Sequence, residues 1–152
     1  MRSSRADPDF RFEDIVIGRK ELSGTYLLSE VEIIDFARRY DPLPIHIDIK
    51  VAQASSFGGI IAAGSHMLAV KQILLHDLPY SGGVIVSLGH DEVRFVKPLR
   101  GGSLCQVEIE WLAVRPSANK PERGVAVAGV TLLADGVAVM TLKELMLMKR
   151  RG

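Results

Sequence analysis

One segment of this chain, residues 57–76, constrains its fold more than any other. It begins Phe-Gly-Gly-Ile-Ile-Ala-Ala-Gly-Ser and continues with large aliphatic side chains. The segment is apolar on nearly every side and its first residues are very small. This pattern is typical of a helix that is surrounded by other elements and packs closely against backbone. We therefore predict a central, buried helix from Phe57 to about His76.

The part of the chain that follows this segment has the pattern of β-structure. Within residues 104–114, polar side chains alternate with apolar ones, which is typical of a strand with one buried face. Ala134-Asp135-Gly136 indicates a hairpin turn, and residues 115–124 are predicted to form a long polar loop. The predicted strands are Val84–Leu88, Glu92–Val96, Leu104–Val114, Val125–Leu133 and Val137–Met148.

The first third of the chain is predicted to contain one strand and two short helices. The strand covers Leu22–Leu28, and Ser29 then begins a helix with a capping-box pattern. This helix is expected to end near Tyr40, because Pro42 disfavours helical geometry at the residue before it. A second short helix is predicted over residues 48–54, where the first residue is an aspartate that can act as its N-cap.

Together these elements predict an α+β architecture, in which a mostly antiparallel sheet wraps around one central helix. Residues 1–10 are expected to be a flexible arm. Residues 11–152 are expected to form a single domain, because no linker and no internal repeat divides them.

Composition narrows the class of function. Nineteen basic and eighteen acidic residues give a formal charge of +1, without the basic excess of a typical nucleic-acid-binding surface. The single Cys105 cannot form an intrachain disulfide, and no stretch reaches the roughly 18 apolar residues of a membrane span. The N-terminus also lacks the apolar core of a signal peptide. We therefore expect a cytoplasmic protein with no nucleic-acid or membrane partner.

The histidines do not suggest a metal site. The chain has four of them, His46, His66, His76 and His90, and none pairs with another at a spacing typical of metal ligands. One cysteine cannot supply a ligand cluster either. The sequence therefore predicts chemistry without a bound metal.

Asp41 and His46 are the residues that best indicate chemistry. A carboxylate and an imidazole in one site can divide proton donation and proton abstraction between them. In a nearly extended chain the two residues would lie up to ~17 Å apart, so they share a site only if the segment between them bends. The spacing alone leaves two interpretations open: an acid–base pair, or a capped turn followed by a half-buried histidine.

Gly64 lies among small residues near the start of the predicted central helix. Backbone N–H groups at a helix start have no partner within the helix, and the helix dipole attracts negative charge there. Gly64 is therefore either a point where a developing oxyanion binds or a small residue that permits close packing of helix on sheet. The residues alone do not decide between these two roles.

Three blocks of the sequence resemble the MaoC-like dehydratase family, relatives of the (R)-specific enoyl-CoA hydratases. Tyr40–Asp48 is similar to the family's Gly-Asp-x-Asn-Pro-x-His motif, with Leu43 in place of the asparagine. Ser55–His66 is similar to a block that contains Ala-Ser-Gly-x-His in one branch of the family. Asp91–Gly102 resembles the family's Arg-Phe/Trp-x-x-Pro-Val-x-Pro-Gly-Asp strand and turn. The resemblance covers nearly the whole chain, from about residue 12 to residue 148.

The resemblance implies the hot-dog fold and an enzyme that adds or removes water across the 2,3 double bond of an enoyl thioester. The interconversion would be between enoyl-CoA and 3-hydroxyacyl-CoA. Asp41 and His46 would be the catalytic residues, and the backbone at Gly64 and Ser65 would bind the thioester oxygen. Further candidates to line the site are Phe57, His66 and Arg94.

The resemblance also implies that no cofactor is needed, because the acyl-CoA or acyl-carrier-protein thioester is itself the substrate. Hot-dog domains of this kind generally pair through their sheet edges, so a homodimer or a higher homo-oligomer is expected. Two alternatives remain. One is a hot-dog acyl-CoA thioesterase, and the other is a non-catalytic acyl-thioester-binding subunit, which the leucine at position 43 would favour.

Overall fold

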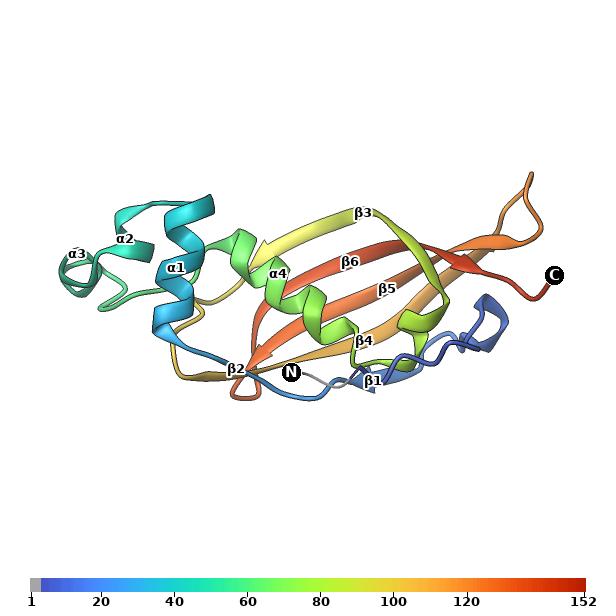
Figure 1. Cartoon of the computed structure of the whole chain (residues 1–152), viewed down its shortest axis with the longest axis horizontal. Helices are drawn as coiled ribbons and strands as arrows, with labels where there is room; N and C mark the ends of the chain where they lie inside the picture. The colour runs from blue at the N-terminus through green and yellow to red at the C-terminus, as the bar shows by residue number, and fades with distance from the viewer. Residues whose placement is uncertain (1–3) are drawn as a thin grey trace.

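A twisted antiparallel sheet makes up most of the molecule, and one long helix lies against one of its faces (Figure 1). The structure, a computed structural model, describes residues 4–152. The strand order is β1-β4-β5-β6-β3, and β2 also pairs with β4. The strands are β1 (Lys20–Leu22), β2 (Tyr26–Leu28), β3 (Val84–Phe95), β4 (Ser103–Pro116), β5 (Arg123–Ala134) and β6 (Val137–Lys149).

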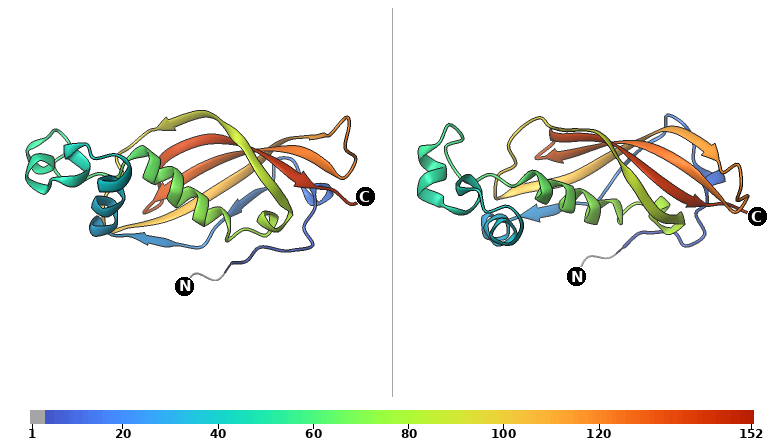
Figure 2. Two further views of the ribbon diagram at one scale, coloured as in Figure 1. Left: turned by 45° about the horizontal axis from the view of Figure 1, so that its top comes forward. Right: turned by 90° about the horizontal axis from the view of Figure 1, so that it is seen from above.

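The long helix is α4 (Gly64–Leu75), and three shorter helices lie beyond its N-terminal end (Figures 1 and 2). They are α1 (Glu30–Tyr40), α2 (Pro44–Ile47) and α3 (Ile49–Ala54); two 3-10 turns are η1 (Phe12–Asp14) and η2 (Pro79–Gly83). The predicted α+β hot-dog architecture, an antiparallel sheet around a central apolar helix, is confirmed. Within residues 4–152, none of the helices combines the length and the hydropathy that a membrane span requires.

Burial of apolar side chains explains why α4 is central. Met67, Val70 and Leu74 of the helix are nearly inaccessible, as are Trp111 and Leu132 of the sheet, and all five belong to one hydrophobic core. Removing this apolar surface from water is the main favourable contribution to folding. The same burial predicts that the helix cannot move far without opening the core.

The prediction that the central helix begins at Phe57 is wrong, because α4 begins only at Gly64. The preceding residues use their peptide groups in contacts with other parts of the chain. The Ile61 N–H donates to the Ile45 carbonyl at 3.3 Å, and the Ala62 N–H donates to the Leu99 carbonyl at 2.8 Å. These bonds hold residues 60–63 outside the helix, although their composition is compatible with it.

The predicted strands also need correction at their ends. The two strands expected over residues 84–96 are one strand, β3, whose pairing with β6 shifts register three times. The single strand expected over residues 22–28 is two short strands, β1 and β2. Strands β4 and β5 extend further than expected, to Pro116 and from Arg123, so the loop between them is shorter.

The expected flexible arm, residues 1–10, lies partly outside the described residues, since residues 1–3 are not among them. In the part that the structure describes, the Asp7 N–H donates to the Pro79 carbonyl at 2.9 Å, and Phe10 packs against the core. Gly82 faces this segment closely, because a Cβ there would come within 1.9 Å of the Asp7 carbonyl oxygen. These contacts place the segment against η2.

A buried ion pair crosses the core between α4 and β6. Lys71 is 1% exposed and Glu144 is 3% exposed, and their Nζ and Oε2 atoms are 3.1 Å apart. His90 of β3 joins the pair, with its Nε2 at 2.9 Å from the same Glu144 oxygen. Burial lowers the pKa of the Lys71 ammonium, and the neighbouring Glu144 carboxylate opposes this shift.

Removing one member of this pair should destabilise the protein strongly. We expect Glu144→Gln to lower the free energy of unfolding by about 3–5 kcal/mol, because it leaves the buried Lys71 cation without its counter-charge. The double variant Lys71→Met/Glu144→Leu should recover most of that loss, since it removes both charges from the core. Urea denaturation at neutral pH measures both effects.

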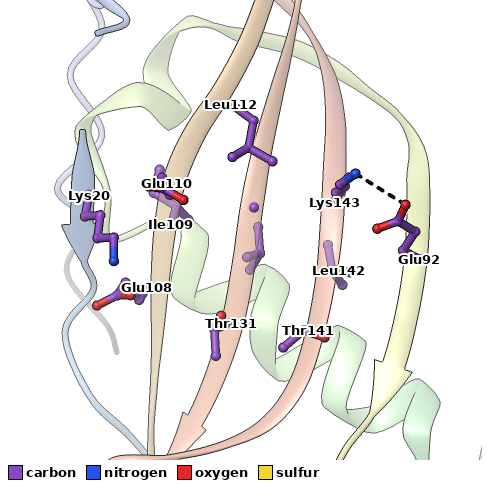
Figure 3. A pocket seen from close by; sticks show the side chains of 12 residues that line it. Lys20, Glu92, Glu108, Ile109, Glu110, Leu112, Thr131, Thr141, Leu142 and Lys143 are labelled. Atoms are coloured by element: carbon purple, nitrogen blue, oxygen red, sulfur yellow. Dashed lines mark hydrogen bonds and ion pairs between the residues drawn. The ribbon is translucent and has the colours of Figure 1, made fainter. Parts of the chain in front are cut away.

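The exposed pair Lys143–Glu92 on the opposite face of the sheet provides a control (Figure 3). Its Nζ–Oε1 distance of 3.3 Å resembles that of the buried pair, but the two side chains are 43% and 67% exposed. Lys143→Met should therefore change the free energy of unfolding by less than about 1 kcal/mol. Equal effects from the buried and the exposed substitution would contradict a burial-dependent role for Lys71 and Glu144.

Candidate active site

The turn after α1 brings Asp41 and His46 together. Asp41 is the C-cap of α1, where its N–H donates to the Ala37 carbonyl at 2.9 Å. Its own carbonyl accepts a hydrogen bond from the Leu43 N–H at 2.9 Å. Pro44 then begins α2, a short helix that the sequence analysis missed although proline is common at a first helical position. The Asp41 Oδ2 and His46 Nε2 atoms end up 3.6 Å apart.

Leu43 stands at the N-cap of α2, and its side chain makes no capping hydrogen bond. An asparagine at this position, as in the related motif, is a strongly preferred N-cap residue. The helix relies instead on Pro44, which fixes one backbone angle in advance, and on the bond from the His46 N–H to the Leu43 carbonyl at 2.9 Å. The substitution thus leaves the bend in place.

A backbone carbonyl fixes the orientation of the His46 ring. His46 is buried, and its Nδ1 lies 2.7 Å from the Ile61 carbonyl oxygen. A carbonyl oxygen can only accept, so Nδ1 carries the hydrogen. In the neutral ring Nε2 then has a free lone pair, on the side where Asp41 lies. His46 is thus held as a potential proton acceptor.

The gap between Asp41 and His46 is suited to a small molecule. At 3.6 Å the two atoms are too far apart for a good hydrogen bond to each other. A water oxygen can still lie at ~2.8 Å from both, which is a normal hydrogen-bond distance. The pair can therefore hold one water by two hydrogen bonds and remove a proton from it.

A cavity of about 310 Å³ opens beside His46, and most of its lining is apolar. Asp41 is not among the lining residues, so its carboxylate reaches the cavity region only through its position beside His46. The lining residues are His46, Phe57, Ile61, Ala62, Gly64, Met67, Phe95, Val96, Lys97 and Pro98. We name this space the His46 cavity. Its composition suits an apolar chain more than a polar ligand.

The N-terminal end of α4 opens into the His46 cavity at Gly64. In the described part of the chain, no carbonyl or side chain accepts a hydrogen bond from the Gly64 or Ser65 N–H. A Cβ at position 64 would come within 2.5 Å of the Phe95 ring. Glycine is therefore required for the ring to lie against the helix start, and the free N–H groups suit an oxygen that gains negative charge.

The other predicted site residues are distributed differently. Phe57 lines the His46 cavity, whereas Ser65 is exposed and is not among the lining residues. His66 is buried, stacks on Phe36 at 4.2 Å between ring centroids, and lines a different groove along α1. Arg94 pairs with Thr141, which faces the side of the sheet away from α4 (Figure 3).

Phe95, and not Arg94, is the residue of β3 that reaches the His46 cavity. The register shift between Asp91 and Arg94 reverses which side chains face α4 beyond that point. Met67 and Lys97, which also line the cavity, were missed by the sequence analysis as well. The apolar i, i+3 relation of Gly64 and Met67 on one helix was the signal that could have indicated Met67.

A metal centre and a reactive cysteine are two other possible sources of chemistry in the described part of the chain. Among residues 4–152, no group of three or more His, Cys, Asp or Glu side chains is placed to hold a metal ion. Burial raises the pKa of the Cys105 thiol to about 11, so this side chain is protonated at neutral pH and is a poor nucleophile. Asp41 and His46 therefore remain the candidates for acid–base chemistry in this region.

A family model and a solved structure both relate this chain to MaoC-like proteins. A family model described as "MaoC like domain" matches residues 13–131. The crystal structure of a MaoC-like dehydratase from Rhodospirillum rubrum is 30% identical, with a TM-score of 0.86, and the match covers 94% of this chain and 99% of that one. A curated relative from Bacillus subtilis, the uncharacterized protein YdeM, is 25% identical over 72% of this chain and 79% of its own length.

A further solved structure is the (R)-hydratase from A. caviae involved in PHA biosynthesis. It is 24% identical, with a TM-score of 0.70, and the match covers 90% of this chain and 98% of that one. At this identity the likeness concerns the fold.

The geometry of His46 predicts its tautomer. We expect ¹⁵N NMR of the neutral ring to show a protonated Nδ1 and an unprotonated Nε2, because the Ile61 carbonyl accepts from Nδ1. The exposed His76 is the comparison within the same spectrum. A His46 ring with its hydrogen on Nε2 would contradict the proposed contact with Ile61.

Proposed function

Since the chain belongs to the MaoC-like dehydratase family, we propose that it adds water to, or removes water from, the 2,3 double bond of an acyl thioester. The observation that carries this proposal is the 3.6 Å approach of Asp41 Oδ2 and His46 Nε2 beside the His46 cavity. The free N–H of Gly64, which lines the same cavity as His46, also supports it. The solved (R)-hydratase of the same fold is in agreement with this chemistry.

The reaction can be written with these residues. Asp41 and His46 hold a water, and His46 Nε2 takes one of its protons as the oxygen bonds to C3 of the enoyl group. The electron pair of the double bond moves toward the thioester carbonyl, whose oxygen becomes negative and accepts a hydrogen bond from the Gly64 N–H. C2 then receives a proton from the acid–base pair. Dehydration follows the same steps in reverse.

We propose that the reaction needs no cofactor, because the water supplies both the hydroxyl group and the proton that the product gains. The substrate would be an acyl-CoA or an acyl-carrier-protein thioester. The apolar lining of the His46 cavity, with Phe57, Met67 and Phe95, supports an acyl chain as the group bound there.

Substitution of the pair tests the proposal. We expect Asp41→Asn and His46→Gln each to lower the rate of hydration of crotonyl-CoA by at least ~100-fold, since each removes a group that handles a proton. The measurement is the loss of enoyl absorbance, and His76→Gln is the control because His76 is exposed and lies outside the site. Unchanged rates in both variants would falsify the assignment.

The same assay separates the alternative functions. A thioesterase would release free thiol from crotonyl-CoA, whereas hydration removes the enoyl absorbance without thiol release. A subunit that only binds would change neither the enoyl absorbance nor the amount of free thiol. Calorimetry would still show that it binds an acyl-CoA. Either of these results for the wild-type protein would replace the hydratase proposal.

We also propose that the protein forms a homodimer through β3. This strand is at an edge of the sheet and pairs only with β6 among the described strands. Its exposed side chains include Ile85, Val86 and Leu88, and the last two are each 51% exposed. A long, apolar edge strand is open to pairing with another chain, and natural monomers usually protect such edges with charge.

Charged side chains on this edge should therefore dissociate the dimer. We expect Val86→Lys/Leu88→Lys to shift the mass measured by sedimentation from dimer to monomer, because like charges would face each other across the paired strands. Leu112→Lys, on the face of the sheet that Figure 3 shows, should leave the mass unchanged. A double variant that stays dimeric would show that β3 is not the interface.

A further inference from the structure

His66 of α4 and Phe36 of α1 form a direct contact between the two helices that carry the ends of the proposed site. Helix α1 ends at Asp41, and helix α4 begins at Gly64, two residues before His66. The Phe36 and His66 rings stack at 4.2 Å with an angle of 5° between their planes. At 1.5 Å per residue along a helix, this contact is ~3 Å from Gly64 and ~8 Å from Asp41 along the two axes.

The His66 ring is buried in an unusual way. The residue is 3% exposed, and its Nδ1 has no hydrogen-bond partner within the part of the chain that the structure describes. Its Nε2 faces the Glu32 carboxylate, with Oε1 at 3.8 Å, which is longer than a hydrogen bond. Leaving a buried polar group unsatisfied costs ~1–3 kcal/mol. A histidine is therefore a poor choice here if apolar packing is the only requirement.

Glu32 is itself held in place. It lies one helical turn before Phe36, so both side chains face α4. The Tyr26 hydroxyl of β2 donates a hydrogen bond to Glu32 Oε1, and the Glu32 N–H donates to the Ser29 hydroxyl at 3.1 Å. The carboxylate that His66 faces is thus fixed to the sheet as well as to α1.

We propose that His66 and Glu32 are positioning residues, which set the distance between the Asp41–His46 pair and the Gly64 N–H. This inference rests on the proposed hydratase function, because it assigns these two features to opposite sides of one substrate. The stack fixes how closely α1 approaches α4. The attraction between the imidazole and the anchored carboxylate fixes the rotation of the ring, and so the placement of the first turn of α4.

The charge state of His66 agrees with this role. Burial lowers the pKa of the imidazole, and the Glu32 carboxylate acts in the opposite direction. The effect of burial is the larger one, so the pKa is lowered and the neutral ring is favoured at neutral pH. In the tautomer that carries its hydrogen on Nε2, this hydrogen faces Glu32. A neutral imidazole in this contact is oriented by Glu32 and adds no charge of its own next to the start of α4.

Two substitutions separate the polar contact from the packing. His66→Phe keeps an aromatic ring to stack on Phe36 and removes both nitrogens. Glu32→Gln keeps an acceptor for Tyr26 and removes the charge. Asp35→Asn is the matched control, since Asp35 is exposed on the same helix and, among the described residues, forms no hydrogen bond or ion pair with His66. If His66→Phe does not fold, Tyr26→Phe is a milder variant, because it removes only the hydroxyl that holds Glu32.

We expect His66→Phe and Glu32→Gln each to lower kcat for crotonyl-CoA at least about tenfold, with KM changed by less than about threefold. A misplaced hydrogen-bond donor weakens the transition state much more than substrate binding, and a shift of ~1 Å can cost ~100-fold in rate. Asp35→Asn should retain the wild-type kcat. Wild-type kcat in both test variants overturns the proposal, as does a rise in KM with kcat unchanged.

A measurement without turnover keeps this inference separate from the proposed function. In ¹H–¹⁵N spectra, the Gly64 amide and the His46 ring nitrogens should shift in His66→Phe and Glu32→Gln but not in Asp35→Asn. If the wild-type protein does not hydrate crotonyl-CoA and these shifts are observed, the proposed function fails while the positioning role stands. Unchanged Gly64 and His46 signals reject the positioning role, whatever the activity.

Discussion

The short non-helical segment of residues 60–63 is the constraint on which the rest of the site depends. Its peptide groups bind outward instead of to each other: one bond goes to α2, one to the Leu99 carbonyl, and the Ile61 carbonyl accepts from His46. All four side chains are buried, so the segment cannot shift without opening the core. Because these residues stay out of the helix, α4 starts with free N–H groups beside the imidazole that the same segment orients.

The two buried histidines, His46 and His66, differ in how their ring nitrogens are hydrogen-bonded. His46 satisfies one nitrogen with a backbone carbonyl and keeps the other available toward Asp41. His66 satisfies neither nitrogen with a normal hydrogen bond, and is held by a ring stack and by a carboxylate at 3.8 Å. Buried polar groups usually have partners, so each exception needs a physical reason. In our proposals, the reason is proton transfer for the first ring and the placement of a helix for the second.

The features that could be predicted from the sequence are those encoded by local periodicity. The alternation along residues 104–114 identified β4 because each strand has one buried face. The start of α4 could not be found in this way, since Ile60–Ala63 has helix-compatible residues whose true partners, Ile45 and Leu99, are distant in sequence. For the same reason, spacing could nominate Asp41 and His46 but could not show that a turn brings them within 3.6 Å.

Strand β3 shows how one irregularity decides which side chain reaches the site. His90 faces α4, where it meets Lys71 and Glu144. In a regular strand Arg94 would share that face and Phe95 would point away, because side chains alternate. Between Asp91 and Arg94, however, three steps on β3 match two on β6, and Glu92 has a φ of 54°. This extra residue places Phe95 opposite the buried Met140, and its ring against Gly64. The bulge therefore gives the His46 cavity an apolar wall where plain alternation would have placed a cation.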